Sequence, residues 1–468
     1  MSVVALDGTG LSIADLRRIA DGAARVTIAA SGAQRLRRSW QAACELTQPV
    51  YGRTTGVGGN CGECASGAGH GMRLLRSHAS AIGDPVPERE VRAMLAVRVN
   101  QVLRGGSGLQ PAIAEAMVTV LNSGAHPQVH EHGSVGTGDL GPLAELGLAL
   151  TGAGRWNGQP PSPVTFQEGD ALALISSNAL TIGRAALAVA TVRKLLNAST
   201  RVTALTLCAV GGATEPFAPE VHRNRPHAGA KRVAAEVLAQ LGGAAIPGRR
   251  VQDPFGLRCF PQVHGPALEA VADAESVLSA EINAAAENPL ITPVGAFHHG
   301  GSHTAQLALA LDRLRLAVLA TAQLSAARLS MLTEPEHTGL RPFLAAGPPG
   351  SSGIMLLEYS AGSALAELRA AAFPATFGHA VLSRGTEDHA GFASQAARQT
   401  EQLADAYRLV LACELVAAVR AHRMLESRIE APVRELYEQA CCRLDPDVQD
   451  RPLSDDVSIA AALLDELT

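Results

Sequence analysis

Several features that would place this chain of 468 residues in a special class are missing from it. No run of about 18 uncharged apolar residues occurs, and the N-terminus MSVVALDGTG lacks the basic and then apolar pattern of a signal peptide. Basic blocks are also missing and the formal net charge is −5, which argues against nucleic acid or an anionic membrane as a partner. We expect a cytoplasmic protein that acts on a small molecule.

The eight cysteines are few for a chain of this length, and without an export signal they indicate free thiols rather than a disulfide framework. Cys61 and Cys64 form the one spaced pair, in Cys-Gly-Glu-Cys. A redox or metal half-site and two unremarkable thiols in a glycine-rich loop are the alternatives. No second such pair follows and no thioredoxin-like pattern surrounds the first, which favours two thiols.

The residues that are abundant predict a mainly α-helical fold. Hydrophobic residues make up 47% of the chain, and alanine, leucine, arginine and glutamate dominate long stretches. Leucines recur at helical spacing in two of these stretches, at residues 140–150 and 307–319. Runs of β-branched residues with a period of two are scarce, so we expect at most a small hairpin near residues 20–50. No repeat of 20–50 residues is visible, which argues against a solenoid.

Glycine and proline cluster in a few loops that also hold tyrosine, histidine, arginine and glutamate. Glycine lets a backbone approach a ligand closely, so several such loops in a helical protein favour a binding or catalytic site over simple turns between helices. The loops are residues 51–71, 132–141, 253–265, 297–301 and 346–353.

Five segments in these regions follow one another in a recognisable order. Together they resemble the aromatic amino acid ammonia-lyase and aminomutase family, whose members act on histidine, phenylalanine and tyrosine, and the resemblance spans nearly the whole chain. The segments are Tyr51-Gly-Arg-Thr-Thr-Gly-Val-Gly58, Arg76-Ser-His-Ala79, Gly133-Ser-Val-Gly-Thr-Gly-Asp-Leu140, Gln252-Asp-Pro-Phe-Gly-Leu-Arg258 with Pro261-Gln-Val-His264, and Glu281-Ile-Asn283 with Glu287-Asn-Pro-Leu290; Phe297-His298, Glu387-Asp388-His389 and Asp450-Arg-Pro-Leu-Ser454 add support.

The resemblance implies an elongated, almost all-α fold on a central bundle of long helices, assembled as a homotetramer whose active sites each draw on three subunits. We expect an N-terminal domain over residues 1–195, which carries the loops near Tyr51, His78 and Thr137, and a long-helix bundle with a C-terminal region over residues 196–468. The resemblance also implies that no cofactor is added. In the family, an Ala-Ser-Gly tripeptide cyclises with loss of two waters into a methylidene-imidazolone electrophile.

The resemblance implies roles for single residues as well. Tyr51 matches the tyrosine that takes the β-proton, a role that requires nearby positive charge or helix N-termini to lower the pKa of the phenol. Arg258 matches the arginine that binds the substrate carboxylate, for which a guanidinium has the right bidentate geometry. A structural tyrosine and a surface arginine are the alternatives.

Further positions match residues that hold the rest of the substrate. His78, after Ser77, is typical of the histidine-using members, and Glu387 matches a carboxylate that faces the substrate's amino group or ring. Gln252 and His298 match polar residues of the same cavity. Each could instead be a buried polar group with satisfied hydrogen bonds.

The electrophile-forming loop departs from the family pattern. Where the family has Gly-Ser-Val-Gly-Ala-Ser-Gly-Asp-Leu, the chain is one residue shorter and has Gly136, Thr137 and Gly138 in place of the tripeptide. In one interpretation, the Gly138 amide attacks the Gly136 carbonyl and dehydration of the threonine gives an ethylidene analogue. In the other, no electrophile forms and the pocket serves a different reaction or none.

Two more departures favour the second interpretation. Phe255 replaces a tyrosine of the family, and Ser176 replaces an asparagine unless Asn178 is displaced into that role. The sequence therefore predicts a carbon–nitrogen lyase or aminomutase acting on an α-amino acid or a related carboxylated molecule. A family member that catalyses a different elimination, addition or isomerisation, and a non-catalytic ligand-binding or scaffold homologue, are the alternatives.

A metal site is a further alternative for the segment Phe297-His298-His299-Gly-Gly-Ser-His303. His299 and His303 are four residues apart and could share a face toward zinc or nickel. No carboxylate or cysteine is close in sequence, which favours polar residues that line a cavity instead, so we expect no metal.

Overall fold

The computed structural model describes residues 2–65, 69–243, 245–426 and 428–467, which form two compact units. The first unit comprises Met1–Ala188, Ala274–Asp312 and Pro374–Arg398, and the second comprises Val189–Asp273, Arg313–Phe373 and Gln399–Thr468. The division expected at residue 195 lies close to the first of these boundaries. It does not anticipate the two later segments that return to the first unit.

The first unit holds the shorter helices and the small sheets. Strands β1 (Ser2–Leu6) and β2 (Ala24–Ile28) pair in parallel, with α1 (Ile13–Ala20) between them. The hairpin expected near residues 20–50 is therefore wrong, because β2 pairs with the preceding N-terminal strand and residues 30–45 form α2. The other helices are α2 (Ala30–Glu45), α3 (His70–His78), α4 (Glu88–Arg104), α5 (Pro111–Ser123), α6 (Leu140–Leu150) and α7 (Asp170–Ile175).

Three short antiparallel pairs complete the strands of this unit. They pair β3 (Ile82–Pro85) with β5 (His130–His132), β4 (His126–Pro127) with β6 (Trp156–Asn157), and β7 (Leu290–Thr292) with β8 (Gly295–Phe297). The loop after β8 leads directly toward the predicted site.

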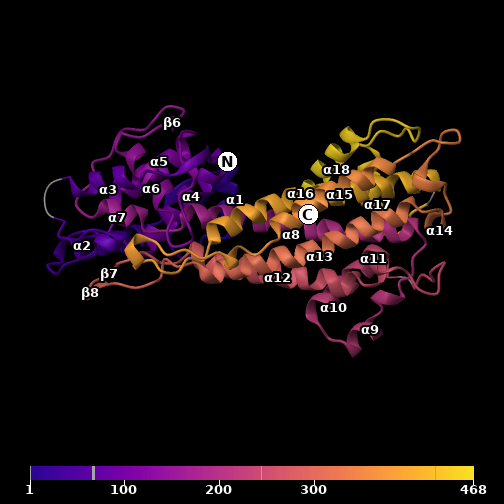
Figure 1. Cartoon of the computed structure of the whole chain (residues 1–468), viewed down its shortest axis with the longest axis horizontal. Coiled ribbons are helices and arrows are strands. Elements are labelled where there is room, and N and C mark those ends of the chain that lie inside the picture. Colours follow the sequence, from indigo (N-terminus) through magenta and orange to yellow (C-terminus); the bar gives the residue numbers. More distant parts are fainter. Residues whose placement is uncertain (1, 66–68, 244, 427, 468) are drawn as a thin grey trace. The chain divides into compact units, whose positions relative to one another are not determined.

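Four long helices dominate the chain (Figure 1): α8 (Ala179–Ala209), α12 (Phe260–Ile282), α13 (Ala305–Thr333) and α16 (Ala393–Met424). In the second unit, buried polar contacts hold them side by side. The Glu414 carboxylate of α16 accepts hydrogen bonds from Arg328 and Ser325 of α13 and from Thr206 of α8. His264 of α12 lies 2.8 Å from the Thr321 hydroxyl of α13. The predicted mainly α fold with a bundle of long helices is confirmed.

Shorter helices cover the rest of the second unit. They are α9 (Pro219–Asn224), α10 (Ala228–Gln240), α11 (Phe255–Arg258), α14 (Pro335–Thr338), α15 (Met355–Ala371), α17 (Arg434–Cys441) and α18 (Ser454–Glu466). One stretch, Asp170–Ala209, is long and apolar enough by composition to cross a membrane, and its most apolar window is wholly buried in the structure. Such burial is equally typical of a helix in a protein core.

A buried ion pair fixes the backbone beneath the predicted site. Arg98 of α4 donates to Glu287 at 2.9 Å, and both side chains are almost completely buried. The same guanidinium donates to the carbonyls of Ala173 and Leu174 at the end of α7. Because Arg98 binds both segments, the end of α7 and the loop after Glu287 are held close together.

Candidate active site

Loops of the first unit enclose a cavity of about 320 Å³. Five of the residues predicted for the site line it. Its lining consists of Tyr51, Val57, His78, Thr137, Leu140, Leu172, Ile175, Ser176, Asn288, His299, Gly300, Ser302, His303, Thr386, Glu387, Asp388 and His389. Among these residues the carboxylates of Glu387 and Asp388 carry charge, and neither lysine nor arginine is present. The cavity wall contributed by this chain is therefore suited to a cationic group.

The altered loop lies against the beginning of α16. Gly136 has a positive φ of 88°, and a Cβ atom there would lie 2.8 Å from the backbone nitrogen of Ala393. Glycine is therefore the residue that suits this position, because it adopts a positive φ without strain and has no Cβ atom to meet the Ala393 backbone. The neighbouring Val135 carbonyl accepts a hydrogen bond from the Phe392 backbone at 2.9 Å.

Three helices begin next to this loop. Asp139 directly precedes α6, and its carboxylate accepts hydrogen bonds of 2.8 Å from the backbone and the hydroxyl of Thr181 in the first turn of α8. The Gly136 carbonyl accepts from Thr304, which directly precedes α13. Complete burial raises the pKa of Asp139, and the hydrogen bonds from Thr181 act in the opposite direction by lowering it. The helix N-termini give the loop a positive electrostatic field.

The loop does not fit the methylidene-imidazolone of the family. Threonine replaces the serine that supplies the methylidene carbon. Cyclisation also removes the oxygen of the first carbonyl, and here the Gly136 oxygen accepts from the hydroxyl of Thr304 at 2.8 Å and from its backbone nitrogen at 3.2 Å. Thr304 is 2% exposed, so loss of that oxygen would leave two buried donors unpaired, at about 1–3 kcal/mol each.

Tyr51 lies in the cavity wall with its hydroxyl directed at its own loop. The Gly58 backbone donates to the Tyr51 hydroxyl at 2.6 Å, and the Tyr51 backbone donates to His298 Nε2 at 3.2 Å. Burial raises the pKa of Tyr51, the Glu387 carboxylate adds to the rise, and the bond from Gly58 opposes it. A base role requires a lowered pKa of the Tyr51 phenol, and the groups of this chain raise that pKa instead. His298 holds the Tyr51 backbone and is not among the residues that line the cavity.

His78 and Glu387 share one wall with the altered loop. The Thr137 hydroxyl donates to Glu387 Oε2 at 3.3 Å, and Gly59, in the loop of Tyr51, donates to the Ser383 hydroxyl at 2.8 Å. His78 Nδ1 lies 3.0 Å from the Leu74 carbonyl and 3.0 Å from the Ser77 hydroxyl, and in the tautomer that donates from Nδ1 to the carbonyl Nε2 has the free lone pair. Burial lowers the pKa of His78, and the hydrogen bond to Leu74 and the Glu387 carboxylate oppose this shift.

Ser176 lines the cavity in the position predicted for the family's asparagine. Its hydroxyl accepts from the Asn288 backbone at 2.9 Å. The Asn178 amide nitrogen donates to the Ser302 carbonyl at 2.6 Å, and Asn178 is not among the residues that line the cavity.

Gln252, Phe255 and Arg258 form a separate cluster in the second unit and do not line this cavity. Arg258 lies over the Phe255 ring, 4.1 Å from its centroid. With the amide orientation that satisfies both groups, the Gln252 oxygen accepts from Arg258 at 2.6 to 3.0 Å. Phe255 is 60% exposed, so the cluster presents a guanidinium and an aromatic ring at the surface.

Two motifs remain, the Cys61–Cys64 pair and the histidines His299 and His303. Cys61 and Cys64 are exposed free thiols. Within the described part of the chain, no three histidine, cysteine or acidic residues are grouped so as to hold a metal. His299 and His303 line the cavity instead, together with Asp388 and His389, which the motif Glu387-Asp388-His389 contains but for which no role was predicted. For His299 and His303, their spacing of four residues was the feature of the sequence that indicated a shared site.

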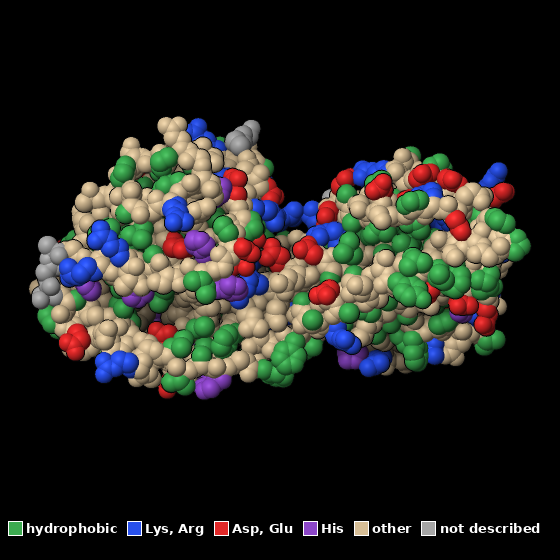
Figure 2. All heavy atoms as spheres, turned by 45° about the horizontal axis from the view of Figure 1, so that its top comes forward, with side chains coloured by type: hydrophobic (Ala, Val, Ile, Leu, Met, Phe, Trp, Pro, Cys, Tyr) green, Lys and Arg blue, Asp and Glu red, His purple; other side chains and the backbone are tan. Residues whose placement is uncertain are grey.

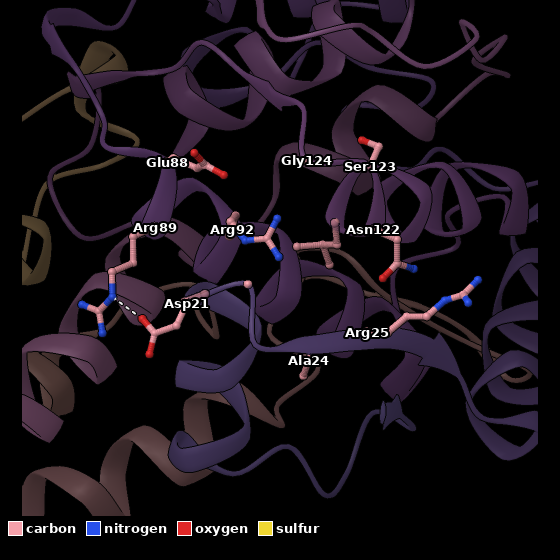
Figure 3. Close-up of a pocket in the computed structure, with 12 residues that line it drawn as sticks. Asp21, Ala24, Arg25, Glu88, Arg89, Arg92, Asn122, Ser123 and Gly124 are labelled. Carbon is pink, nitrogen blue, oxygen red and sulfur yellow. Dashed lines mark hydrogen bonds and ion pairs between the residues drawn. The ribbon is translucent and has the colours of Figure 1, made fainter. Parts of the chain in front are cut away.

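A larger pocket of about 770 Å³ lies elsewhere in the first unit (Figure 3) and contains none of the predicted site residues. Arg89 and Asp21 form an ion pair of 2.6 Å across it, and Arg92 donates to the Ile19 carbonyl. Three of its charged side chains are therefore bonded to one another or to the backbone, whereas the smaller cavity collects groups able to exchange protons.

Comparisons with known proteins agree with this architecture. The family described as aromatic amino acid lyase matches residues 11–441. A histidine ammonia-lyase of Geobacillus thermodenitrificans is 35% identical over 99% of this chain and 97% of its own. A histidine ammonia-lyase structure from Trypanosoma cruzi covers 100% of this chain and 94% of its own, with a TM-score of 0.92 and 27% identity. Ergothionase from Treponema denticola, an ergothioneine-degrading enzyme, has the same fold, with a TM-score of 0.92, 23% identity and coverage of 100% and 99%.

The long-helix bundle and a loop-enclosed cavity that combines tyrosine, histidine and glutamate are those of a lyase that acts on amino acids. The chain belongs to the aromatic amino acid lyase family. The site of this chain departs from the family pattern described above at Gly136, Thr137 and Gly138.

Proposed function

We propose that this protein is a carbon–nitrogen lyase for a carboxylated, imidazole-bearing amine that carries its own activation as a leaving group, such as a quaternary ammonium. One observation carries the proposal. The cavity keeps Tyr51, His78 and Glu387 around a loop that does not fit the family's electrophile. Without an electron sink a simple amine is a poor leaving group, so the activation must belong to the substrate.

The charges of the cavity support a cationic substrate. Glu387 and Asp388 face it, and the described lining contains no lysine or arginine. A quaternary ammonium matches these carboxylates and departs as a neutral amine. With Nδ1 donating to the Leu74 carbonyl, His78 Nε2 has a lone pair that can accept the N–H of an imidazole. The ergothioneine-degrading ergothionase of Treponema denticola has the same fold.

The substrate carboxylate needs a cation that this cavity wall lacks, and we propose that Arg258 of a second copy supplies it in a homotetramer. The Arg258 cluster is presented at the surface of the second unit. Large apolar side chains of α13, α15 and α16 are exposed as well: Leu316 (49%), Leu356 (58%) and Leu409 (45%). Figure 2 shows hydrophobic side chains reaching the surface in patches. Such faces favour subunit contacts. Light scattering that finds a monomer at micromolar concentration would contradict this assembly.

The substrate preference tests the proposed reaction. The purified protein is given L-histidine or its Nα-trimethyl betaine, and the conjugated product is followed by ultraviolet absorption together with the released amine. We expect kcat/KM for the betaine to exceed that for histidine by at least about 100-fold, because only the betaine has an activated leaving group. Faster release of ammonia from histidine would refute the proposal.

A further inference from the structure

Two histidines of the cavity form a hydrogen-bonded pair to which the proposed reaction has not yet assigned a role. His303, just before α13, and His389, in the loop before α16, place Nε2 and Nδ1 2.9 Å apart. The ring centroids are 5.1 Å apart with an interplanar angle of 32°. The His303 backbone also donates to the Gly300 carbonyl at 3.0 Å, which fixes the start of this segment.

The hydrogen bond determines what the pair can do. Between two neutral imidazoles, one ring donates its N–H and the other accepts, so the two outer nitrogens present one further N–H and one lone pair. The pair can therefore take up one proton and keep its internal hydrogen bond. Histidine is also the side chain that changes charge between about pH 5 and 8.

The other titratable groups of the cavity are less suited to accept a proton near neutral pH. His299 Nδ1 accepts from the Gly301 backbone at 2.8 Å, so its Nε2 carries a proton and is buried without a partner. Burial lowers the pKa of His78 and raises the pKa of Tyr51. Glu387 and Asp388 are the carboxylates that line the same cavity as the pair.

We propose that the His303–His389 pair is the proton acceptor that activates Tyr51, a role that rests on the proposed elimination. Tyr51 is a protonated phenol at neutral pH and must lose its proton before it can act as a base. The pair lines the same cavity and has the free lone pair that this transfer requires.

The steps balance without any further reactant. The pair takes the phenol proton, and the Tyr51 oxygen then takes the proton of the substrate's β-carbon. The C–N bond breaks, its electron pair leaves with the amine, and a carbon–carbon double bond forms. A quaternary ammonium departs as a neutral tertiary amine, so its positive charge ends on the protonated pair, which returns the proton to solvent.

Two conservative variants separate proton transfer from structural support. His389→Asn keeps a polar atom at the place of Nδ1, and His303→Gln keeps one at the place of Nε2, but neither amide titrates. We expect each variant to fold with the melting temperature of the parent, and His389→Asn to lower kcat by about 100-fold or more. His227→Asn, which changes an exposed histidine at the start of α10, is the matched control and keeps the parent's rate and pH profile.

The pH profile for the betaine distinguishes proton transfer from mere packing. If the pair accepts the proton of Tyr51, the acid limb of kcat/KM in the parent depends on it, and this limb is lost in His389→Asn. An unchanged acid limb in both variants overturns the proposal. In that case normal turnover by the parent would still support the lyase function.

A binding measurement tests the pair independently of turnover. Imidazole-4-propionate has the ring and the carboxylate but no amine to eliminate. Calorimetry at pH 7 in two buffers of different ionisation enthalpy should show that the parent takes up protons when it binds this anion, because an anion stabilises the protonated pair. His389→Asn should lose that uptake. The same uptake in the parent and the variant overturns the proposal even if no substrate is turned over.

Discussion

Replacement of Tyr51 by phenylalanine is expected to lower kcat by about 100-fold or more, while the affinity for imidazole-4-propionate stays within about threefold of the parent. The change removes the hydroxyl that takes the β-proton and keeps the ring that fills the cavity wall. The Gly58 backbone loses its acceptor, which lies in a loop and not in the helical core. Steady-state rates with the betaine, together with calorimetry, measure the two effects separately.

Tyr359→Phe is the matched control, because Tyr359 lies on α15 and is 68% exposed. It should retain the parent's rate. Burial raises the pKa of Tyr51, so ionisation of the free phenol contributes nothing to the acid side of the pH profile. Equal rates for Tyr51→Phe and the parent would remove this tyrosine from the reaction.

Replacement of Arg258 by methionine should weaken the binding of carboxylated ligands by about 30-fold or more, equivalent to about 2 kcal/mol or more. Methionine keeps much of the side-chain volume and removes the guanidinium that pairs with a carboxylate. Imidazole, which has no carboxylate, should bind both proteins with similar affinity. Arg232→Met changes an exposed arginine of α10, 57% exposed at the side chain, and should leave both affinities unchanged.

A mixing experiment tests whether Arg258 comes from another copy. We expect slow turnover in Tyr51→Phe chains and weak substrate binding in Arg258→Met chains, but a mixed tetramer contains sites with an intact Tyr51 from one chain and an intact Arg258 from another. Co-expression of the two should therefore recover a measurable part of the parent's activity. If co-expressed chains form mixed tetramers without any recovery, the shared site is contradicted.

The parts of the fold that depend on periodicity were predictable from the sequence. Leucines at helical spacing predicted the helices α6 and α13, and the ordered motifs predicted that Tyr51, His78 and Glu387 share one site. The small sheets were not predictable in the same way. Strand β1 is only five residues long, and nothing in its composition shows that Ser2–Leu6 pairs in parallel with β2 across α1.

The contacts that decide the chemistry join residues far apart in sequence. Thr304 holds the Gly136 carbonyl across 168 residues, and His303 meets His389 across 86. No local sequence pattern predicts either contact. From the sequence alone, the spacing of His299 and His303 raised the alternative of a pair of metal ligands. The direction of the pKa shift of Tyr51 likewise depends on burial and on Glu387, which only the folded chain brings together.

The intact mass of the purified parent chain tests most directly the claim that this site works without the family's electrophile. Cyclisation of Gly136, Thr137 and Gly138 would remove two waters from the polypeptide, and the loop geometry around the Gly136 carbonyl opposes that loss. Mass spectrometry of the whole chain, with the peptide that contains Thr137 analysed alongside, reads the outcome without any substrate. The account predicts the full mass of the encoded polypeptide. A mass short by two waters, located in that peptide, would contradict it.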